Sequence, residues 1–549
     1  MEILTVKNLS FRYAMNEAPT LKDVSFSVGE GEMLVVCGAT GSGKSTLLRL
    51  LKPELAPVGE MTGELFFDGR PMSSLSARES SGGIGYVMQQ PEQQIVTDKV
   101  WHELAFGPEN QGLPQGEIRR RVAEMASYFG MEDLFLRDTH SLSGGQKQLL
   151  NLASVMVMRP SVLLLDEPTA QLDPIAAADF IATLDKLRRE LSLTVIVIEH
   201  RLEELLPICD RLLVMENGSL LTIAPPREAV RTLSGREDLL LAMPAAVRLY
   251  HGLSDGTEQS EAPLTIREGR SFLKERYRNE IRSVPEPDEV NGAKALSFEN
   301  VCFRYERGGD DILSELSFDV YENECFCILG GNGAGKSTAL SVAAGVLKPY
   351  SGVVRLFGKR WKEYAGRMPY GREVAYLPQD VTTVFSRNTV REELESAHVD
   401  PSEFPYALEP LMAKHPYDLS GGERQLVALA MITASKPRLL LLDEPSKGLD
   451  ACARMEVVSV LKALNEKGVS IVCVTHDVEF AASIADRVAL FFRGEVISSD
   501  RPRKFFSGNR FYTTPISRMT VGFFENAITV DDAVSLCLEN GRRGETVCP

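Results

Sequence analysis

The pattern G-x-x-x-x-G-K-S occurs twice in this chain of 549 residues, at positions 38–45 and 330–337. In this pattern the glycines let the backbone turn so that its N–H groups point at a chain of phosphates. The lysine places a positive charge beside the terminal phosphates, and the serine hydroxyl is a ligand for Mg²⁺. One match alone is weak evidence, but two matches followed by the same downstream motifs predict two phosphate-binding loops. The residues are Gly38, Gly41, Gly43, Lys44 and Ser45 in the first loop, and Gly330, Gly333, Gly335, Lys336 and Ser337 in the second.

Two acidic residues end a short apolar run in each half, after residues 162–165 and 439–442. Such a run is typical of a buried parallel strand whose C-terminal end delivers carboxylates to a ligand crevice. We expect the first acid of each pair to hold Mg²⁺, directly or through water. We expect the second to polarise an attacking water molecule as general base. The pairs are Asp166 with Glu167, and Asp443 with Glu444.

A histidine ends the next apolar run in each half, at His200 and His476. A lone histidine is more often a hydrogen-bonded core or surface residue than a catalytic one. Here the spacing repeats, because His200 follows Asp166 by 34 residues and His476 follows Asp443 by 33. The repeated spacing predicts a catalytic role for both histidines.

Between the phosphate-binding loop and the acidic pair, each half carries L-S-G-G followed by Gln or Glu, at 142–146 and 419–423. Each motif begins an apolar-periodic helix and has the S-x-x-Q/E spacing of a capping box. The glycines would also let an anion approach this helix N-terminus, where the helix dipole favours negative charge such as a γ-phosphate. The residues are Ser143, Gly144, Gly145 and Gln146 in the first half, and Ser420, Gly421, Gly422 and Glu423 in the second.

With these motifs the chain resembles the ATP-binding-cassette (ABC) ATPases over nearly all of its length. The resemblance implies an α/β fold of two tandem P-loop nucleotide-binding domains, each with a helical signature subdomain and a small C-terminal subdomain. It implies ATP and Mg²⁺ as cofactors and ATP hydrolysis as the activity. In this family the signature of one cassette completes the ATP site of the other, in an intramolecular, head-to-tail cassette dimer. Ser420–Glu423 would then close over nucleotide at Lys44, and Ser143–Gln146 over nucleotide at Lys336.

The remaining positions of the family pattern are also filled in both halves. The Q-loop glutamine of the family contacts the metal and the attacking water, and an aromatic residue stacks on the adenine. The D-loop aspartate follows the acidic pair, and a threonine follows each loop serine among the nucleotide-binding residues. In that order, the matching residues are Gln89, Tyr13, Asp173 and Thr46 in the first half, and Gln379, Tyr305, Asp450 and Thr338 in the second. Because no catalytic position departs from the pattern, we expect both sites to be competent.

Composition indicates a large globular chain. With 44% hydrophobic and 25% charged residues the chain can bury sizeable cores. We expect no signal peptide and no direct membrane insertion, because no apolar run reaches the roughly 18–20 residues that a spanning helix needs. The nine cysteines include no C-x-x-C pair, which favours reduced thiols over disulfides or zinc. A net charge of −16 argues against nucleic acid as a partner, so membrane association would depend on a protein partner.

The motifs form a tandem repeat. Tyr13, Lys44 and Gln89 recur about 290–292 residues later, whereas the signature, the acidic pair and the histidine recur about 276–277 residues later. The second half is therefore about 13 residues shorter between its Q-loop and its signature. A T-x-x-acid helix start at Thr265 and again at Thr529 predicts the same small C-terminal subdomain in both halves. We expect a nucleotide-binding domain at 1–240, its C-terminal subdomain at 241–280, a linker at 281–293, a second nucleotide-binding domain at 294–508 and its subdomain at 509–549.

The segment after Gln89 narrows the class of ABC protein. It reads Q-P-E-Q-Q-I-V at 90–96 and A-F-G-P-E-N at 105–110, which is similar to the energy-coupling-factor importers of vitamins, cobalt and nickel. The resemblance implies an ATPase on the cytoplasmic face of the cell membrane, peripheral to it. Its partners would be a transmembrane coupling subunit and a substrate-binding membrane protein. The second half carries N-T-V-R-E-E-L at 388–394 instead, and the plain alternative for the first string is a short helix ended by Gly-Pro.

Three other functions fit parts of the pattern. A duplicated sugar-importer ATPase is an alternative within transport. A soluble tandem-cassette translation factor would carry a long, charged helical arm between its halves, and the proline-containing stretch here is too short for one. A DNA-repair cassette protein is disfavoured by the acidic charge and by the absence of zinc-type cysteines.

In cassette importers the segment after the Q-loop lines a groove for helices of the membrane subunit. Apolar residues ringed by acids suit an amphipathic helix that carries arginine or lysine. We therefore expect a docking surface in each half. It would comprise Glu92, Asp98, Glu103 and Glu109 around Ile95, Val96, Trp101 and Phe106, and Asp380, Glu392 and Glu393 around Val381, Val384 and Phe385.

Overall fold

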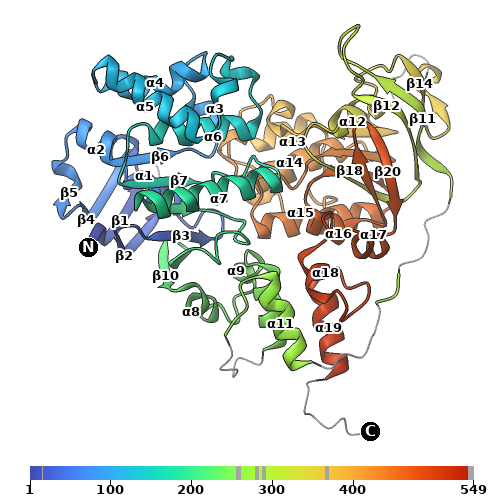
Figure 1. Cartoon of the computed structure of the whole chain (residues 1–549). Coiled ribbons are helices and arrows are strands. Elements are labelled where there is room, and N and C mark those ends of the chain that lie inside the picture. The colour runs from blue at the N-terminus through green and yellow to red at the C-terminus, as the bar shows by residue number, and fades with distance from the viewer. Residues whose placement is uncertain (15–16, 255–260, 278–283, 287–291, 365–369, 542–549) are drawn as a thin grey trace. The chain divides into compact units, whose positions relative to one another are not determined.

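The computed structural model describes residues 1–14, 17–254, 261–277, 284–286, 292–364 and 370–541 (Figure 1). They form two compact units. The first is Met1–Val247 with Gln259–Thr265, and the second is Arg248–Glu258 with Ile266–Pro549. Most of the predicted linker 281–293 lies outside the described residues, and the predicted domain boundaries stay a prediction.

Two sheets form the frame of the first unit. An antiparallel sheet has the strand order β2-β1-β4-β5, and a six-stranded sheet has the order β10-β9-β3-β8-β7-β6, parallel except for β10. The strands are β1 (Glu2–Tyr13), β2 (Leu21–Gly29), β3 (Met33–Gly38), β4 (Gly59–Phe67), β5 (Arg70–Pro71), β6 (Ile84–Val87), β7 (Val162–Asp166), β8 (Thr194–Ile198), β9 (Arg211–Glu216) and β10 (Ser219–Ala224). The helices are α1 (Lys44–Leu50), α2 (Ala77–Gly83), α3 (Pro91–Gln94), α4 (Val100–Asn110), α5 (Gln115–Tyr128), α6 (Gly144–Met156), α7 (Pro174–Leu191), α8 (Pro226–Arg231) and α9 (Glu237–Leu241).

The second unit repeats both sheets, in the orders β12-β11-β14-β15 and β16-β17-β18-β13-β19-β20. The strands are β11 (Lys294–Phe303), β12 (Leu313–Tyr321), β13 (Cys325–Leu329), β14 (Ser351–Leu356), β15 (Lys359–Arg360), β16 (Val374–Leu377), β17 (Leu439–Asp443), β18 (Ser470–Thr475), β19 (Arg487–Phe492) and β20 (Glu495–Asp500). The helices are α11 (Ile266–Arg276), α12 (Lys336–Ala343), α13 (Val390–Ser396), α14 (Gly421–Thr433), α15 (Ala451–Glu466), α16 (Val478–Ile484), α17 (Pro502–Gly508), α18 (Pro515–Thr520) and α19 (Val530–Asn540). The predicted α/β fold with two tandem nucleotide-binding domains is confirmed.

Parallel pairing gathers the predicted motifs at one edge of each six-stranded sheet. All five residues of β7 are buried, as its apolar run predicts, and the strand ends at Asp166. In the register, Val87 pairs with Leu165, and Asp166 pairs with Ile198. The Q-loop, the acidic pair and the histidine therefore leave the sheet side by side, next to the phosphate-binding loop that follows β3.

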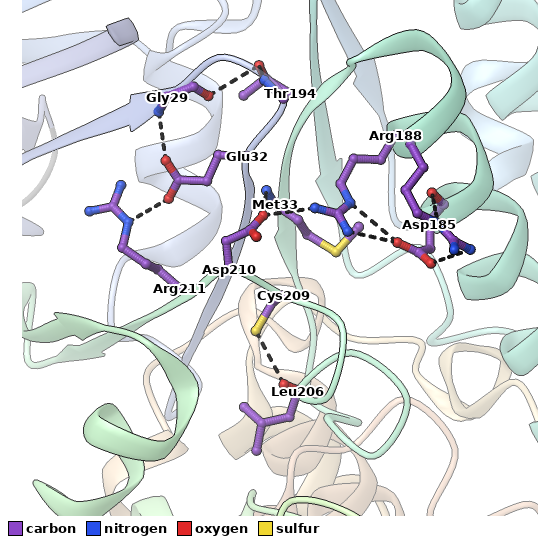
Figure 2. Close-up of polar contacts among 12 residues, drawn as sticks. Gly29, Glu32, Met33, Asp185, Arg188, Thr194, Leu206, Cys209, Asp210 and Arg211 are labelled. Carbon is purple, nitrogen blue, oxygen red and sulfur yellow. Dashed lines mark hydrogen bonds and ion pairs between the residues drawn. The ribbon is translucent and has the colours of Figure 1, made fainter. Parts of the chain in front are cut away.

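The opposite end of β3 is anchored by charged residues (Figure 2). Glu32 accepts hydrogen bonds from the Gly29 N–H at 2.7 Å and from Arg211 Nε at 2.5 Å. Asp210 accepts from the Met33 N–H at 2.8 Å and from Arg188 Nη1 at 2.9 Å. The two carboxylates each join a backbone N–H group, at the end of β2 or at the start of β3, to an arginine, and together they tie down the strand that carries the phosphate-binding loop.

The second unit repeats most of this anchor. Glu324 accepts from the Tyr321 N–H at 2.7 Å and pairs with Arg487 Nε at 2.9 Å, and Asp486 accepts from the Cys325 N–H at 2.8 Å. Burial raises the pKa of Glu324 to about 7. The two sheets are therefore held in a similar way at the end remote from the phosphate-binding loop.

The helical subdomains differ between the units. The first unit has α5 between α4 and α6, whereas residues 397–420 between α13 and α14 form turns and the 3₁₀-helices η7 (Glu409–Leu411) and η8 (Pro416–Asp418). Residues 397–420 of the second half therefore contain no counterpart of α5.

Small helices follow each nucleotide-binding domain in sequence. Thr529 caps α19 in a reciprocal capping box with Asp532, and α11 begins directly after Thr265. Although α11 precedes the linker in sequence, it packs against α18 (Figure 1). In the described part of the chain, no helix is both long enough and apolar enough to span a bilayer.

Candidate nucleotide sites

The first phosphate-binding loop is a tight turn that only glycine can form at its key positions. Gly43 has φ 94°, and a Cβ at Gly38 would lie 2.2 Å from the Met215 carbonyl oxygen. The loop holds its own lysine, because Lys44 Nζ donates to the carbonyl oxygens of Gly38 at 2.7 Å and Ala39 at 2.9 Å. The buried ammonium is thereby aimed into the loop, where a phosphate chain would lie.

Two of the predicted metal ligands of the first site, Ser45 and Asp166, lie together, whereas the third, Gln89, is hydrogen-bonded to Glu167. Ser45 Oγ donates to Asp166 Oδ1 at 2.9 Å, and Tyr86 OH donates to Asp166 Oδ2 at 3.0 Å. Burial raises the pKa of Asp166. A buried carboxylate beside a hydroxyl is a donor set of the kind that Mg²⁺ prefers, and a cation there would compensate the desolvated charge.

Glu167 joins the Q-loop to the histidine. Its Oε2 accepts from Gln89 Nε2 at 2.6 Å, and its Oε1 lies 2.8 Å from His200 Nε2. Glu167 also has φ 47°, in the left-handed region that costs energy for a residue with a Cβ. The backbone turn that presents this carboxylate is therefore maintained against a local cost, which is common at functional sites.

The second site repeats these contacts with differences. Lys336 Nζ donates to the carbonyl oxygens of Gly330 and Gly331, both at 2.9 Å, and Ser337 Oγ donates to Asp443 Oδ1 at 2.9 Å. Burial raises the pKa of Asp443 to about 6.

Around Glu444 the geometry changes. Glu444 is again left-handed, with φ 51°, but it pairs with His476 through Nδ1 at 2.9 Å rather than through Nε2. The Q-loop residue Gln379 is exposed, whereas Gln89 is half-buried. The two hydrolysis centres are thus alike in residues and unlike in arrangement.

The predicted adenine-stacking residues stand beside the loops. Tyr13 OH lies 2.9 Å from Thr46 Oγ1, and Tyr305 OH lies 3.1 Å from Thr338 Oγ1. These bonds tie each aromatic ring to the helix that follows the phosphate-binding loop, and each ring has an edge-on phenylalanine neighbour.

The signature residues stand apart from these clusters, each at a helix N-terminus. Ser143 and Gln146 form a reciprocal capping box at the start of α6, and Ser420 and Glu423 form one at the start of α14. A Cβ at Gly422 would lie 2.4 Å from Ala453 Cβ, so this glycine allows α14 to approach α15. The predicted D-loop aspartates Asp173 and Asp450 act locally as N-caps of α7 and α15.

Sequence reasoning missed three residues at these sites. Tyr86 supports Asp166, and its recurrence as Tyr376 at the Q-loop spacing was the available signal. Ser42 Oγ is buried in the loop and has no hydrogen-bond partner among the described residues, which suits a phosphate oxygen. Glu199 is buried before His200 and accepts from the Thr169 N–H at 2.8 Å.

Two acids of the expected docking surface are not on the surface. Glu103 accepts from the Val96 and Thr97 N–H groups at 3.1 and 2.8 Å, and Glu393 accepts from the N–H groups of Ser386 and Arg387. Glu103 is 4% exposed and Glu393 is 0% exposed. The expectation that they orient a partner was wrong, because the carboxylate of each accepts hydrogen bonds from the loop that precedes its own helix.

The fold and the two sites define a protein with two P-loop nucleotide-binding domains. The family model described as "ABC transporter" matches residues 21–170 and 313–447. The chain belongs to the ABC transporter ATPases, and it hydrolyses ATP. A model described as "AAA domain, putative AbiEii toxin, Type IV TA system" also matches, over residues 415–482.

Curated relatives match over nearly the whole length. An ABC transporter ATP-binding protein of Bacillus anthracis is 39% identical, with 97% of this chain and 98% of the relative covered. One from Streptomyces coelicolor is 33% identical, with 90% and 93% covered.

Solved structures match one or both halves. The structure of cbiO1 from Clostridium perfringens, part of the ABC transporter complex cbiONQ, is 33% identical with a TM-score of 0.38, covering 43% of this chain and 95% of that one. An archaeal ribosome recycling factor in complex with a ribosomal stalk protein is 22% identical with a TM-score of 0.57, covering 91% of each chain. The second match concerns the fold alone.

Proposed function

We propose that each site hydrolyses Mg-ATP with its own glutamate as the general base. The Ser45–Asp166 and Ser337–Asp443 pairs would hold the metal, which would neutralise charge on the β- and γ-phosphates. Glu167 would take the proton of the attacking water, with Gln89 and His200 fixing its two oxygens. Glu444 would do the same beside His476.

We propose further that the signatures complete these sites in the head-to-tail manner of the family. Each capping box leaves a helix N-terminus with glycines next to it, and Ser143 and Gly144 are exposed. Exposed N–H groups at such a terminus suit a γ-phosphate. Ser420–Glu423 would serve the nucleotide at Lys44, and Ser143–Gln146 the nucleotide at Lys336.

We propose that this ATPase powers an importer of the energy-coupling-factor type, for a vitamin or a transition metal, on the cytoplasmic face of the membrane. The string A-F-G-P-E-N supports the class, and the structure gives it a packing role too. A Cβ at Gly107 would lie 2.7 Å from Met158 Sδ, and Pro108 is buried inside α4. The residues of this region that stay exposed are therefore the ones that a partner could contact.

The observation that carries the importer proposal is the exposure of three large apolar residues on and just before α4. Trp101 is 39% exposed, Phe106 is 40% exposed and Val96 is 62% exposed, with Asp98 and Glu109 exposed near them in sequence. Large aromatic side chains left in water at a polar rim suit a helix of a transmembrane coupling subunit. A substrate-binding membrane protein would complete the assembly.

The test is membrane attachment in cells that express the full chain. Phe106→Ser with Trp101→Ser should move the protein from the membrane fraction to the supernatant while its ATPase activity in isolation persists. Leu191→Ser is the matched control, because Leu191 is 57% exposed at the end of α7. Retention of the double variant on membranes would contradict the proposal. Fractionation of the unchanged protein with ribosomes would favour the translation-factor alternative.

A further inference from the structure

A chain of charged side chains leads away from the second hydrolysis centre. Asp477, next to His476, accepts from Arg454 Nη1 at 3.1 Å through Oδ2 and caps α16 through Oδ1. Arg454 Nη2 lies 3.9 Å from Glu479 Oε2, and Glu479 Oε1 accepts from Arg248 Nη2 at 2.5 Å. The four side chains are only 10–22% exposed, so their charges are screened less than surface pairs.

Arg248 lies on α10 (Ala245–Leu253), which precedes the linker, yet it belongs to the second compact unit. α10 also packs closely on the last helix, because a Cβ at Gly252 would lie 2.7 Å from Val534 Cγ2 of α19. The charged chain thus begins at the histidine of the second site and ends among the C-terminal helices.

The first half cannot form the same chain. Counted from the D-loop aspartates, Ala177 stands where the second half has Arg454, and counted from the histidines, Arg201 stands where it has Asp477. The arginine is missing and the aspartate is replaced by a residue of opposite charge. The residues that make this connection at the second site therefore do not recur at the first.

We propose that Arg454, Glu479 and Arg248 are positioning residues, through which the C-terminal helices set the rate of hydrolysis at the second ATP site. This inference rests on the proposed roles of Glu444 and His476. Arg454 and the cap of α16 both hold Asp477, and the adjoining His476 pairs with Glu444 at 2.9 Å. Displacing α10 removes one of the two arginines that face Glu479, and this loosens α16 and the histidine in front of it.

The experiment measures single-turnover hydrolysis by the full chain in the Glu167→Gln background, where turnover reports the second site. Arg248→Met should lower the rate constant about threefold to tenfold and leave the nucleotide concentration for half-maximal rate unchanged. Arg248→Lys should recover most of the rate because it keeps the charge. In the Glu444→Gln background, Arg248→Met should leave the rate at the first site unchanged, which a general loosening of the protein would not do.

Arg270→Met is the matched control, since Arg270 also joins the pre-linker segment to the second unit, by a bond from Nη2 to the Val521 carbonyl oxygen at 3.1 Å. A rate with Arg248→Met within twofold of the parent, or an equal loss with Arg270→Met, overturns the proposal. If adding Glu444→Gln to the Glu167→Gln background leaves turnover intact, the site assignment itself fails, and this inference falls with it. If Glu444→Gln abolishes turnover and Arg248→Met does not change it, only the inference fails.

Discussion

Removing the buried carboxylate of Glu393 should open the loop before α13 without harming the rest of the second unit. Glu393 is 0% exposed and accepts two backbone hydrogen bonds, from Ser386 and Arg387. Hydrogen bonds to a charged group contribute about 1.5–3 kcal/mol each, and a buried N–H left without an acceptor adds its own cost. Glu393→Ala should therefore lower the free energy of opening this loop by about 3–5 kcal/mol.

The assay is amide hydrogen exchange at residues 386 and 387. Since each 1.4 kcal/mol is tenfold in an equilibrium constant, exchange there should accelerate by roughly a hundredfold or more. Glu393→Gln keeps an acceptor oxygen and should cost about 1 kcal/mol. Glu392→Ala is the control, because the neighbouring Glu392 is exposed and accepts one bond, from the Asn388 N–H at 3.2 Å. Equal exchange in the two alanine variants would refute the reasoning.

Three further predictions concern the sites and the sheet anchor. Glu167→Gln with Glu444→Gln should retain ATP binding and cut turnover by roughly 10²–10⁴-fold; near-normal activity would exclude the glutamates as bases. Lys44→Ala with Ser420→Arg should cost little more than either change alone, whereas Lys44→Ala with Ser143→Arg should abolish activity; equal behaviour of the two pairs would contradict the head-to-tail arrangement. Burial raises the pKa of Glu324 from 4.5 to about 7. Between these pH values the folded protein keeps a proton that the unfolded chain releases, so the stability that depends on Glu324 falls as pH rises from about 4.5 to 7. Glu324→Gln should make the thermal midpoint less dependent on pH across that window. Glu32→Gln is the control for loss of the equivalent ion pair, and an unchanged dependence on pH in Glu324→Gln would refute the assignment.

Much of the fold was readable from the sequence because the motifs sit where strands end. The apolar runs before Asp166 and Asp443 became fully buried strands, and the S-x-x-Q/E spacing at Ser143 and Ser420 became real capping boxes. In each case a local pattern fixes a local structure, and parallel pairing then brings the ends together.

The features of the sites that could not be predicted depend on tertiary contacts, which the spacing of residues in the sequence does not reveal. The left-handed backbone at Glu167 is unexpected for a glutamate, and no spacing distinguishes the Nε2 contact of His200 from the Nδ1 contact of His476. The acids Glu103 and Glu393 were misread for the same reason. Their charge suggested a surface, but only the folded loop reveals the N–H groups that draw them inward.

The placement of α11 decides where this protein tolerates a cut. Phe272 and Leu273 of α11 are buried, and the helix packs against α18 near the other end of the chain. A first fragment that ends after residue 277 would expose these two apolar side chains to water, because α18 would be on the other fragment. Association with the second fragment would bury them again. A cut after Met243, before α10 begins, would leave both α10 and α11 with their neighbours in the second fragment instead. Two coexpressed fragments should therefore associate more strongly when the chain is divided after residue 277 than when it is divided before α10.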